Sequence, residues 1–272
     1  MWPDIRAEAT VQLRRPANWL LLATAAALNL TFGYAIPYTG YRGGSGGPGA
    51  VTLDRLLPAN FAGVAIGGLP VFIGALALIF GVLVAGSDYG WQTWKTLLVQ
   101  RPSRAAVLAG KLGTIAGGVL LLVVTLLALC ALASVVIAGV EGARAAWPPA
   151  LEVLADLGAG WLIGFMWATV GVALAIGMRA VALPVGIGLV WMLAIQNLIT
   201  GLAAPLLGWV DAAQEFLPGP AAGSLAATLG AGSNTPGIAE LSGQLESVLV
   251  LIAYLVVSAT GAMALLARRD LT

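Results

Sequence analysis

Six stretches of about 20 residues or more contain no Asp, Glu, Lys or Arg, and they limit what this chain can fold into more than any other feature. A helix of about 20 apolar residues, rising about 1.5 Å per residue, crosses the roughly 30 Å hydrocarbon core of a bilayer. The fourth and fifth stretches are separated only by Arg179 and Ala180, which requires a tight antiparallel hairpin. We therefore expect an all-α membrane protein with a single transmembrane domain over residues 1–272, whose spans are approximately 17–37, 61–86, 112–139, 157–178, 181–203 and 247–267.

The composition agrees with this class and excludes several kinds of active site. Hydrophobic residues make up 60% of the chain and charged residues only 9%, which is too apolar for a soluble domain of this length. Histidine is absent, which excludes Ser-His and Cys-His hydrolases and HExxH metalloproteases. The single cysteine, Cys130, lies within an apolar stretch and is interpreted as a small buried hydrophobic residue. No basic stretch is interleaved with aromatics outside the membrane-edge loops, so nucleic acid is not an expected partner.

The distribution of Lys and Arg predicts the orientation, because these residues concentrate in cytoplasmic loops. With both termini cytoplasmic, ten of the 13 basic residues fall on that side: Arg6, Arg14, Arg15, Lys95, Arg101, Arg104, Lys111, Arg179, Arg268 and Arg269. Most acidic residues fall on the other side. The N-terminus does not read as a removable signal peptide. Frequent Ala, Gly and Arg indicate a bacterial source, so a multi-pass protein of the bacterial plasma (inner) membrane is expected.

Two amphipathic segments are expected at the cytoplasmic surface. Residues 1–16 predict an interfacial helix with apolar residues on one face and Arg residues for lipid headgroups. Residues 87–104 predict a short helix whose apolar face contains Trp91, Trp94, Leu97 and Leu98.

Helix-capping residues set the expected limits of this second segment. Ser87 or Asp88 can cap its N-terminus, and Pro102 ends it. Ser103 can then cap the helix that carries Arg104 and Lys111 into the third span.

The order of residues in this loop resembles a known pattern. The permease subunits of the type 2 ATP-binding-cassette (ABC-2 type) exporter family usually have Glu-Tyr, Gly-Thr, a basic residue, Leu-Leu, Pro-x-Ser-Arg and later Gly-Lys after their second span. The chain has Asp88-Tyr89, Thr93-Trp94-Lys95, Leu97-Leu98, Pro102-Ser103-Arg104 and Gly110-Lys111, with Asp88 in place of the glutamate and Gln92 in place of the glycine.

The resemblance implies a transmembrane subunit that works by alternating access. Two permease chains, which we expect to be identical, would surround a central path, and two cytoplasmic ATPase subunits would drive export. The family pattern places Asp88, Thr93, Lys95 and Arg104 in the contact that couples the ATPase to the membrane; we add Trp94 as the aromatic anchor of the apolar face. The chain has no GxxxxGK[ST] loop, so ATP and Mg²⁺ would be bound in the partner, and this chain is expected to have no catalytic residue, metal site or cofactor of its own.

The remaining candidate features lie in the spans and at the outer surface. Residues 204–246 predict two short outer helices, which resemble the outer gate region of the same family. Asn29, Gln196 and Asn197 are candidate path residues, and an interhelical hydrogen bond is the alternative role for each. Adjacent helix positions point about 100° apart, so at most one of Gln196 and Asn197 can face a given lumen squarely. Glycines spaced four apart at 63 and 67, 113 and 117, and 160 and 164 predict close helix packing, within one chain or across a dimer.

Two other functions remain open. A secondary transporter or channel would act without an ATPase, but the uncharged spans disfavour ion or proton coupling. A non-transporting membrane scaffold would need no polar path and would tolerate leucine at Gln196 and Asn197. A membrane enzyme is disfavoured because the sequence contains no nucleophile-base or metal constellation. The sequence does not identify a substrate.

Overall fold

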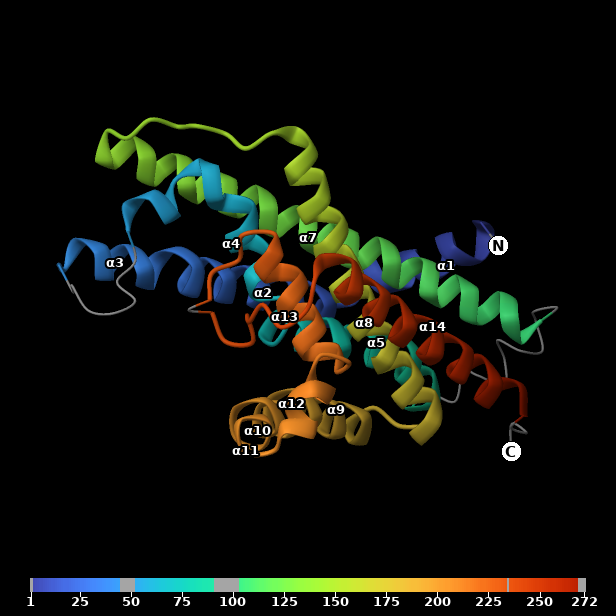
Figure 1. The fold of residues 1–272 in the computed structure, drawn as a ribbon. Coiled ribbons are helices and arrows are strands. Elements are labelled where there is room, and N and C mark those ends of the chain that lie inside the picture. Colours follow the sequence, from blue (N-terminus) through green and yellow to red (C-terminus); the bar gives the residue numbers. More distant parts are fainter. Residues whose placement is uncertain (1, 45–51, 91–102, 234, 269–272) are drawn as a thin grey trace.

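The computed structural model describes residues 2–44, 52–90, 103–233 and 235–268, and side chains from residue 6 onward. The described residues form helices without any strand, and six helical stretches are long and apolar enough to cross a membrane. These stretches are Pro16–Arg42, Phe72–Gly90, Arg104–Glu141, Ala150–Met178, Ala182–Leu206 and Gln244–Arg268. For the described residues, the expected all-α fold with six membrane-length apolar helices is therefore confirmed (Figure 1).

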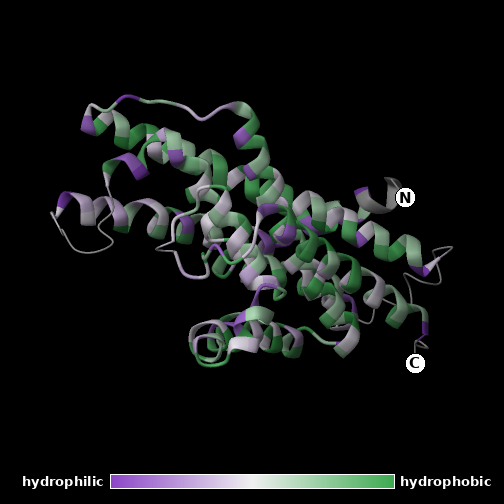
Figure 2. Cartoon of the chain, viewed as in Figure 1, coloured by the Kyte–Doolittle hydropathy of each residue, from purple (hydrophilic) through white to green (hydrophobic). Residues whose placement is uncertain are grey.

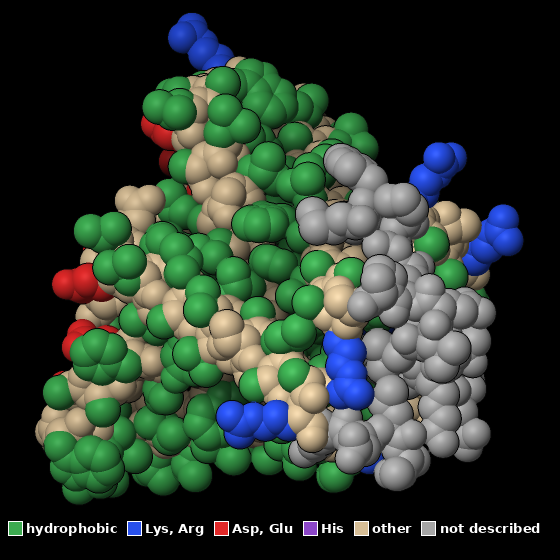
Figure 3. Space-filling model, turned by 90° about the vertical axis from the view of Figure 1, so that its right-hand side faces the viewer, with side chains coloured by type: hydrophobic (Ala, Val, Ile, Leu, Met, Phe, Trp, Pro, Cys, Tyr) green, Lys and Arg blue, Asp and Glu red, His purple; other side chains and the backbone are tan. Residues whose placement is uncertain are grey.

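Hydropathy follows this arrangement. Figure 2 shows apolar residues along most of the long helices and hydrophilic residues mainly near their ends and in the connections. Both termini lie at one end of the helix bundle (Figure 1), and several Lys and Arg side chains gather there (Figure 3). We call this the basic end, and the other the opposite end.

The centre of the bundle is α8 (Ala150–Met178), which packs against α5 (Phe72–Gly90) and α14 (Gln244–Arg268). Glycines allow α5 and α8 to approach closely. A Cβ atom on Gly81 would overlap the carbonyl oxygen of Ala168, and one on Gly171 would overlap that of Leu78. The large side chain of Trp167 is fully buried beside this contact.

The expected second span, 61–86, is broken in two. Its first part forms α4 (Phe61–Gly67), and α5 begins only at Phe72. Pro70 lacks a backbone N–H and cannot continue the helical hydrogen-bond pattern. The prediction of one continuous helix here was wrong, because the apolar composition concealed a proline-containing break inside the protein core.

Two of the candidate spans contain π-helical turns. In the first, α2 (Pro16–Leu30) continues through the π-helical Thr31–Ala35 into α3 (Ile36–Arg42). In the fifth, the elements are α9 (Ala182–Leu189), a π-helix over Val190–Ile195, α10 (Gln196–Leu198), a second π-helix over Ile199–Ala203, and α11 (Ala204–Leu206). π-Helical turns are rare and frequently occur at functional sites.

α7 (Arg104–Glu141) is the longest helix, with 38 residues. At about 1.5 Å per residue it is roughly 57 Å long, so it extends beyond a hydrocarbon core of about 30 Å. The hydroxyl oxygen of Ser103 accepts a hydrogen bond from the Ala106 N–H (3.2 Å), which confirms the predicted cap. At the opposite end, Glu141 accepts hydrogen bonds from the Tyr38 hydroxyl (2.7 Å) and the Arg42 Nε (2.9 Å), which join α7 to α3.

Two short helices lie between α11 and α14, as predicted. α12 (Gly208–Gln214) is partly exposed, whereas α13 (Pro218–Thr228) is almost entirely buried against α4, α8 and α14. The Ser224 hydroxyl donates to the carbonyl oxygen of Ala239 (2.9 Å) and accepts from the Leu241 N–H (3.1 Å). These bonds hold the connection that follows α13 against this helix. Two 3₁₀ turns, Leu53–Leu56 and Pro58–Asn60, precede α4 in the chain.

The N-terminal segment forms α1 (Trp2–Leu13), which agrees with the helix predicted for residues 1–16. α1 packs against the start of α7. The proposed start of the next amphipathic segment was wrong, because Ser87 and Asp88 belong to the last turn of α5. The Ser87 hydroxyl donates to the carbonyl oxygen of Leu83 (2.7 Å), one turn back in the same helix, and accepts from Arg15 Nη1 (2.8 Å).

Candidate functional site

A buried ionic cluster lies at the basic end, centred on Lys111. Its side chain is 1% exposed, and its Nζ atom lies 2.6 Å from Asp88 Oδ2 and 3.4 Å from Glu8 Oε1. The same Nζ donates a hydrogen bond to the carbonyl oxygen of Val84 (3.0 Å). One cation thus joins α1, α5 and α7.

The cluster continues into a polar network around the corner between α1 and α2. Gln12 Nε2 donates to Glu8 Oε1 (2.8 Å), and Asn18 Nδ2 donates to the Gln12 backbone oxygen (2.8 Å). Arg15 Nη1 donates to Ser87 Oγ (2.8 Å). The position of α1 is therefore fixed by charged and polar contacts with α5 and α7 as well as by apolar packing.

Arg104 makes a separate contact between helices. Its Nη1 atom donates to the carbonyl oxygens of Leu266 and Ala267 in the last turn of α14, the second at 3.2 Å. Side chains commonly satisfy the last carbonyls of a helix, and a cation near a helix C-terminus also interacts favourably with the helix dipole. The first turn of α7 is thus attached to the end of α14.

The predicted coupling residues lie around one connection. Asp88 comes just before residues 91–102 and Arg104 just after them, and both side chains contact neighbouring helices. Thr93, Trp94 and Lys95 lie outside the described residues, so the predicted amphipathic helix between spans two and three stays a prediction. Asp88 is held by Lys111 of α7, and Arg104 by the end of α14.

Sequence reasoning missed the roles of Lys111 and Glu8. Lys111 is expected among the cytoplasmic basic residues and belongs to the Gly110-Lys111 pattern, but the sequence reasoning assigned no partner to its charge. A usable signal exists, because Arg104 and Lys111 are seven residues apart and share one helical face at the edge of an apolar stretch. A lysine on that inward face needs an anionic partner, and Asp88 at the end of the preceding span was available.

The candidate path residues occupy three different environments. Asn29 is buried, and its Nδ2 atom donates to the Ala65 carbonyl oxygen (3.3 Å) and lies 3.3 Å from Cys130 Sγ. Where α4 ends, the Leu69 N–H donates to the carbonyl oxygen of Ile66 instead of that of Ala65. Asn29 therefore supplies a hydrogen-bond donor to the Ala65 carbonyl oxygen. Cys130 is fully buried, as predicted.

Gln196 and Asn197 point in different directions, as expected for adjacent helix positions. Gln196 is buried, and its amide lies against Gly219, where an added Cβ would be 2.5 Å from Nε2. Asn197 is exposed on the surface of the chain and donates a hydrogen bond to the Leu193 carbonyl oxygen (2.9 Å) of its own helix. Of the three residues, Asn197 has its side chain on the surface of the single chain, whereas Asn29 and Gln196 are buried.

The cluster at the basic end links three helices through paired charges. Its charges are paired at short distance, and within the described ranges no group of three or more His, Cys, Asp or Glu side chains could hold a metal ion. Among the described residues, the fold and this cluster define an all-helical protein with six helices long and apolar enough to cross a membrane, whose N-terminal helix is bound to the bundle. Comparison of the sequence with protein-family models and with curated proteins gives no match.

Proposed function

We propose that this chain is the transmembrane subunit of an ATP-driven exporter, similar to the permeases of the type 2 ATP-binding-cassette family. Two copies, expected to be identical, would surround the substrate path in a bacterial plasma membrane with both termini cytoplasmic. Two separate ATPase subunits would bind at the basic end and hydrolyse ATP with Mg²⁺. The chain itself would carry no catalytic residue.

One observation carries this proposal: both ends of the connection at residues 91–102 are attached to the helix bundle. On one side, Asp88 is paired with Lys111 of α7, which also contacts Glu8 of α1. On the other side, Arg104 is bonded to the end of α14. A displacement of the connection would therefore be transmitted to α1, α5, α7 and α14 together, which is what coupling to an external motor requires.

The charge pattern supports the same proposal. Within the connection Lys95 and Arg101 add to the basic residues of this end, and Trp91, Trp94, Leu97 and Leu98 supply an apolar face if the segment is helical. An amphipathic basic helix suits docking into an apolar groove with acidic edges. Thr93, Trp94 and Lys95 would then form the contact, while Asp88 and Arg104 would hold its ends.

The substrate path is proposed along the exposed side of the helix that carries Asn197. This helix has π-helical turns on both sides of Gln196–Leu198. Only 22% of the residues in its most apolar 18-residue stretch are buried. A second chain would cover part of this face. Asn29 and Gln196 are buried within one chain, so we propose Asn197 as the first path residue to test.

The test is affinity purification of the tagged chain from its native membranes in mild detergent, followed by identification of co-purifying proteins and an ATPase assay. Recovery of a nucleotide-binding subunit with ATPase activity is expected. The double variant Trp94→Ala/Lys95→Asp should lose that subunit, whereas Arg6→Gln, which removes an exposed charge of α1 at the same end, should retain it. Purification of the chain alone in every detergent would refute the proposal and favour a self-contained transporter or a scaffold.

A further inference from the structure

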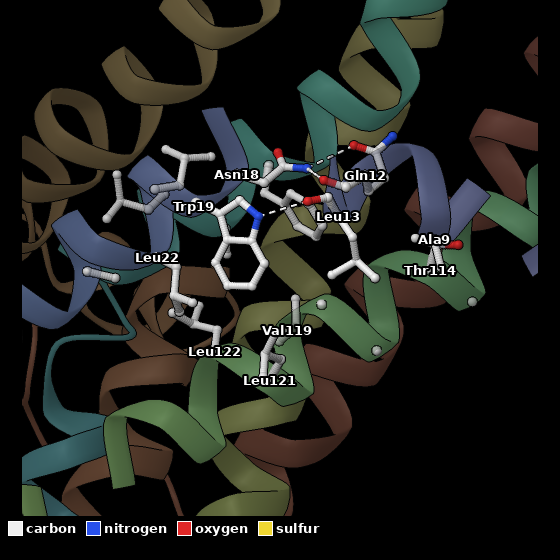
Figure 4. A pocket seen from close by; sticks show the side chains of 18 residues that line it. Ala9, Gln12, Leu13, Asn18, Trp19, Leu22, Thr114, Val119, Leu121 and Leu122 are labelled. Atoms are coloured by element: carbon white, nitrogen blue, oxygen red, sulfur yellow. Dashed lines mark hydrogen bonds between the residues drawn. The ribbon is translucent and has the colours of Figure 1, made fainter. Parts of the chain in front are cut away.

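A narrow apolar cavity runs along the outside of the bundle beside the basic end. It has a volume of about 290 Å³ and lies between α1, α2, α5 and α7. Its walls are mainly leucine, alanine and glycine, and the polar side chains of Gln12, Asn18 and Thr114 lie towards one end. Figure 4 shows Trp19 across the cavity, with its indole N–H donating to the Leu13 carbonyl oxygen (2.8 Å).

The dimensions of the cavity match one lipid chain in one leaflet. Along α7 the lining extends from Gly113 to Leu122, which at about 1.5 Å per residue is roughly 14 Å. This is about half of a hydrocarbon core of about 30 Å. Dividing the volume by that length gives a mean cross-section of roughly 20 Å², far below that of an α-helix about 10 Å wide. Carbon atoms in contact are about 4 Å apart, so a single hydrocarbon chain fits this width.

The cavity faces the surroundings of the chain and has an open wall. Trp19 and Leu121 line it, and both are exposed on the surface of the bundle. Gly117 also lines it, and a Cβ atom added there would meet no other atom within 4 Å. Gly118, by contrast, is covered by Phe80. An unfilled apolar groove of this kind forfeits van der Waals contacts that a lipid chain would supply.

Charge at the polar end selects the kind of lipid. Glu8, the nearby carboxylate, is paired with Lys111 at 3.4 Å and is held by Gln12. Arg14 follows Leu13 of the lining directly and is exposed. An exposed positive charge therefore lies one residue from the lining, at the end where a phosphate group would lie above the chain-binding cavity.

Asn18 adds a second polar feature at the same end. Its Oδ1 atom is buried and has no hydrogen-bond partner among the described residues, while its Nδ2 atom is used by Gln12. A buried acceptor without a donor is unfavourable. This buried acceptor adds to the polar character of the end where Gln12 and Asn18 meet.

We infer that this cavity binds one acyl chain of an anionic phospholipid from the leaflet at the basic end, with its phosphate beside Arg14. The bound lipid fills the space between α1 and α7 and fixes the interfacial helix over the membrane surface. This assignment uses none of the residues proposed for the ATPase contact, and it stands whether or not the chain works with an ATPase.

The test uses the purified full chain in phosphatidylcholine vesicles that contain phosphatidylglycerol with a photoreactive diazirine on one acyl chain. We expect labelling on residues 113–122 that saturates with probe concentration and is displaced by excess unlabelled phosphatidylglycerol. Gly117→Leu should reduce this labelling at least fivefold. The control is Gly139→Leu on the same helix, where an added Cβ also meets no atom within 4 Å but lies outside the cavity, and labelling should be unchanged.

The headgroup is tested separately with a phosphatidylcholine probe of the same chains. The anionic probe should label severalfold more, and Arg14→Gln should bring the ratio of the two close to one. Labelling of the wild-type chain that does not saturate, or equal labelling by both probes, would overturn the assignment. Efficient disulfide formation between two copies of Gly117→Cys would also overturn it, because a second copy would then occupy the face.

Discussion

Removal of the Lys111 ammonium should destabilise the protein more than any other single charge change at the basic end. In Lys111→Met, the Asp88 carboxylate, which is 7% exposed, loses its cation at 2.6 Å, and Glu8 loses its neighbour at 3.4 Å. Breaking a buried ion pair by removing one partner typically costs about 3–5 kcal/mol, because an uncompensated charge stays buried. For a chain of this size such a loss lowers the thermal midpoint by on the order of 10 °C.

A double-mutant cycle separates the interaction free energy of the Lys111–Asp88 ion pair from the free energy lost when side-chain packing changes. Asp88→Leu alone leaves Lys111 with Glu8 and the Val84 carbonyl, so its cost should be smaller than that of Lys111→Met. The double variant should be more stable than the sum of the two losses predicts, by about 1–3 kcal/mol.

The assay measures the thermal midpoint of detergent-solubilised protein. Samples are heated, and the protein that remains folded is quantified by size-exclusion chromatography with fluorescence detection. Arg144→Met removes one exposed charge at the opposite end and should shift the midpoint little. If Lys111→Met is as stable as Arg144→Met, or if the two losses at Lys111 and Asp88 are simply additive, the buried ion pair does not fix these helices.

Three further substitutions test other contacts, two by the thermal midpoint and one by limited proteolysis. Asn29→Leu removes the donor that Ala65 receives at the end of α4 and should cost about 1–2 kcal/mol. Gly81→Ala places a methyl group on the Ala168 carbonyl and should cost about 3 kcal/mol or prevent folding, because the α5–α8 contact cannot widen locally. Arg104→Gln frees the last turn of α14, and limited proteolysis should cleave the C-terminal residues several times faster without a large change in thermal midpoint.

Each of these variants has a matched control within the chain. Asn197→Leu removes an exposed amide that bonds only to its own helix, so its thermal midpoint should be close to wild type. Gly158→Ala adds a methyl group where no atom lies within 4 Å. Arg6→Gln removes an exposed charge of α1 and should leave proteolysis at the C-terminus unchanged. Equal effects in a variant and its control would show that the contact in question contributes nothing specific.

The apolar stretches predicted the number of long helices because composition alone reports whether a segment can cross a bilayer. The same argument failed inside residues 61–86, where Pro70 and the glycines beside it are all compatible with an apolar stretch. Helix breaks within a protein core depend on what satisfies the freed backbone groups, such as Asn29 for the Ala65 carbonyl. That information comes from another helix, 36 residues away in sequence, and no local pattern contains it.

A local pattern predicted a helix cap correctly only where a helix-breaking residue is adjacent to the cap. Ser103 has an extended backbone and caps α7, and it directly follows Pro102 in the sequence, a residue that is not tolerated inside a helix. Ser87 has no such neighbour, so α5 continues to Gly90 and the hydroxyl bonds to its own helix. The candidate site was only partly predictable for a related reason, because the role of Lys111 depends on Glu8, which is more than 100 residues away.

The depth of the ionic cluster explains why the chain can bury charge here. A charge at the bilayer centre costs at least about 2.5–3.5 kcal/mol. Lys111 lies seven residues, or about 10 Å, from the start of a helix that is roughly 27 Å longer than the hydrocarbon core. It is buried by α1 and α5 near one end of this helix, and the neighbouring Glu8 side chain is 18% exposed. The long apolar section of α7 supplies the span, while its first two turns provide charged contacts by which a force applied to residues 91–102 would reach the bundle.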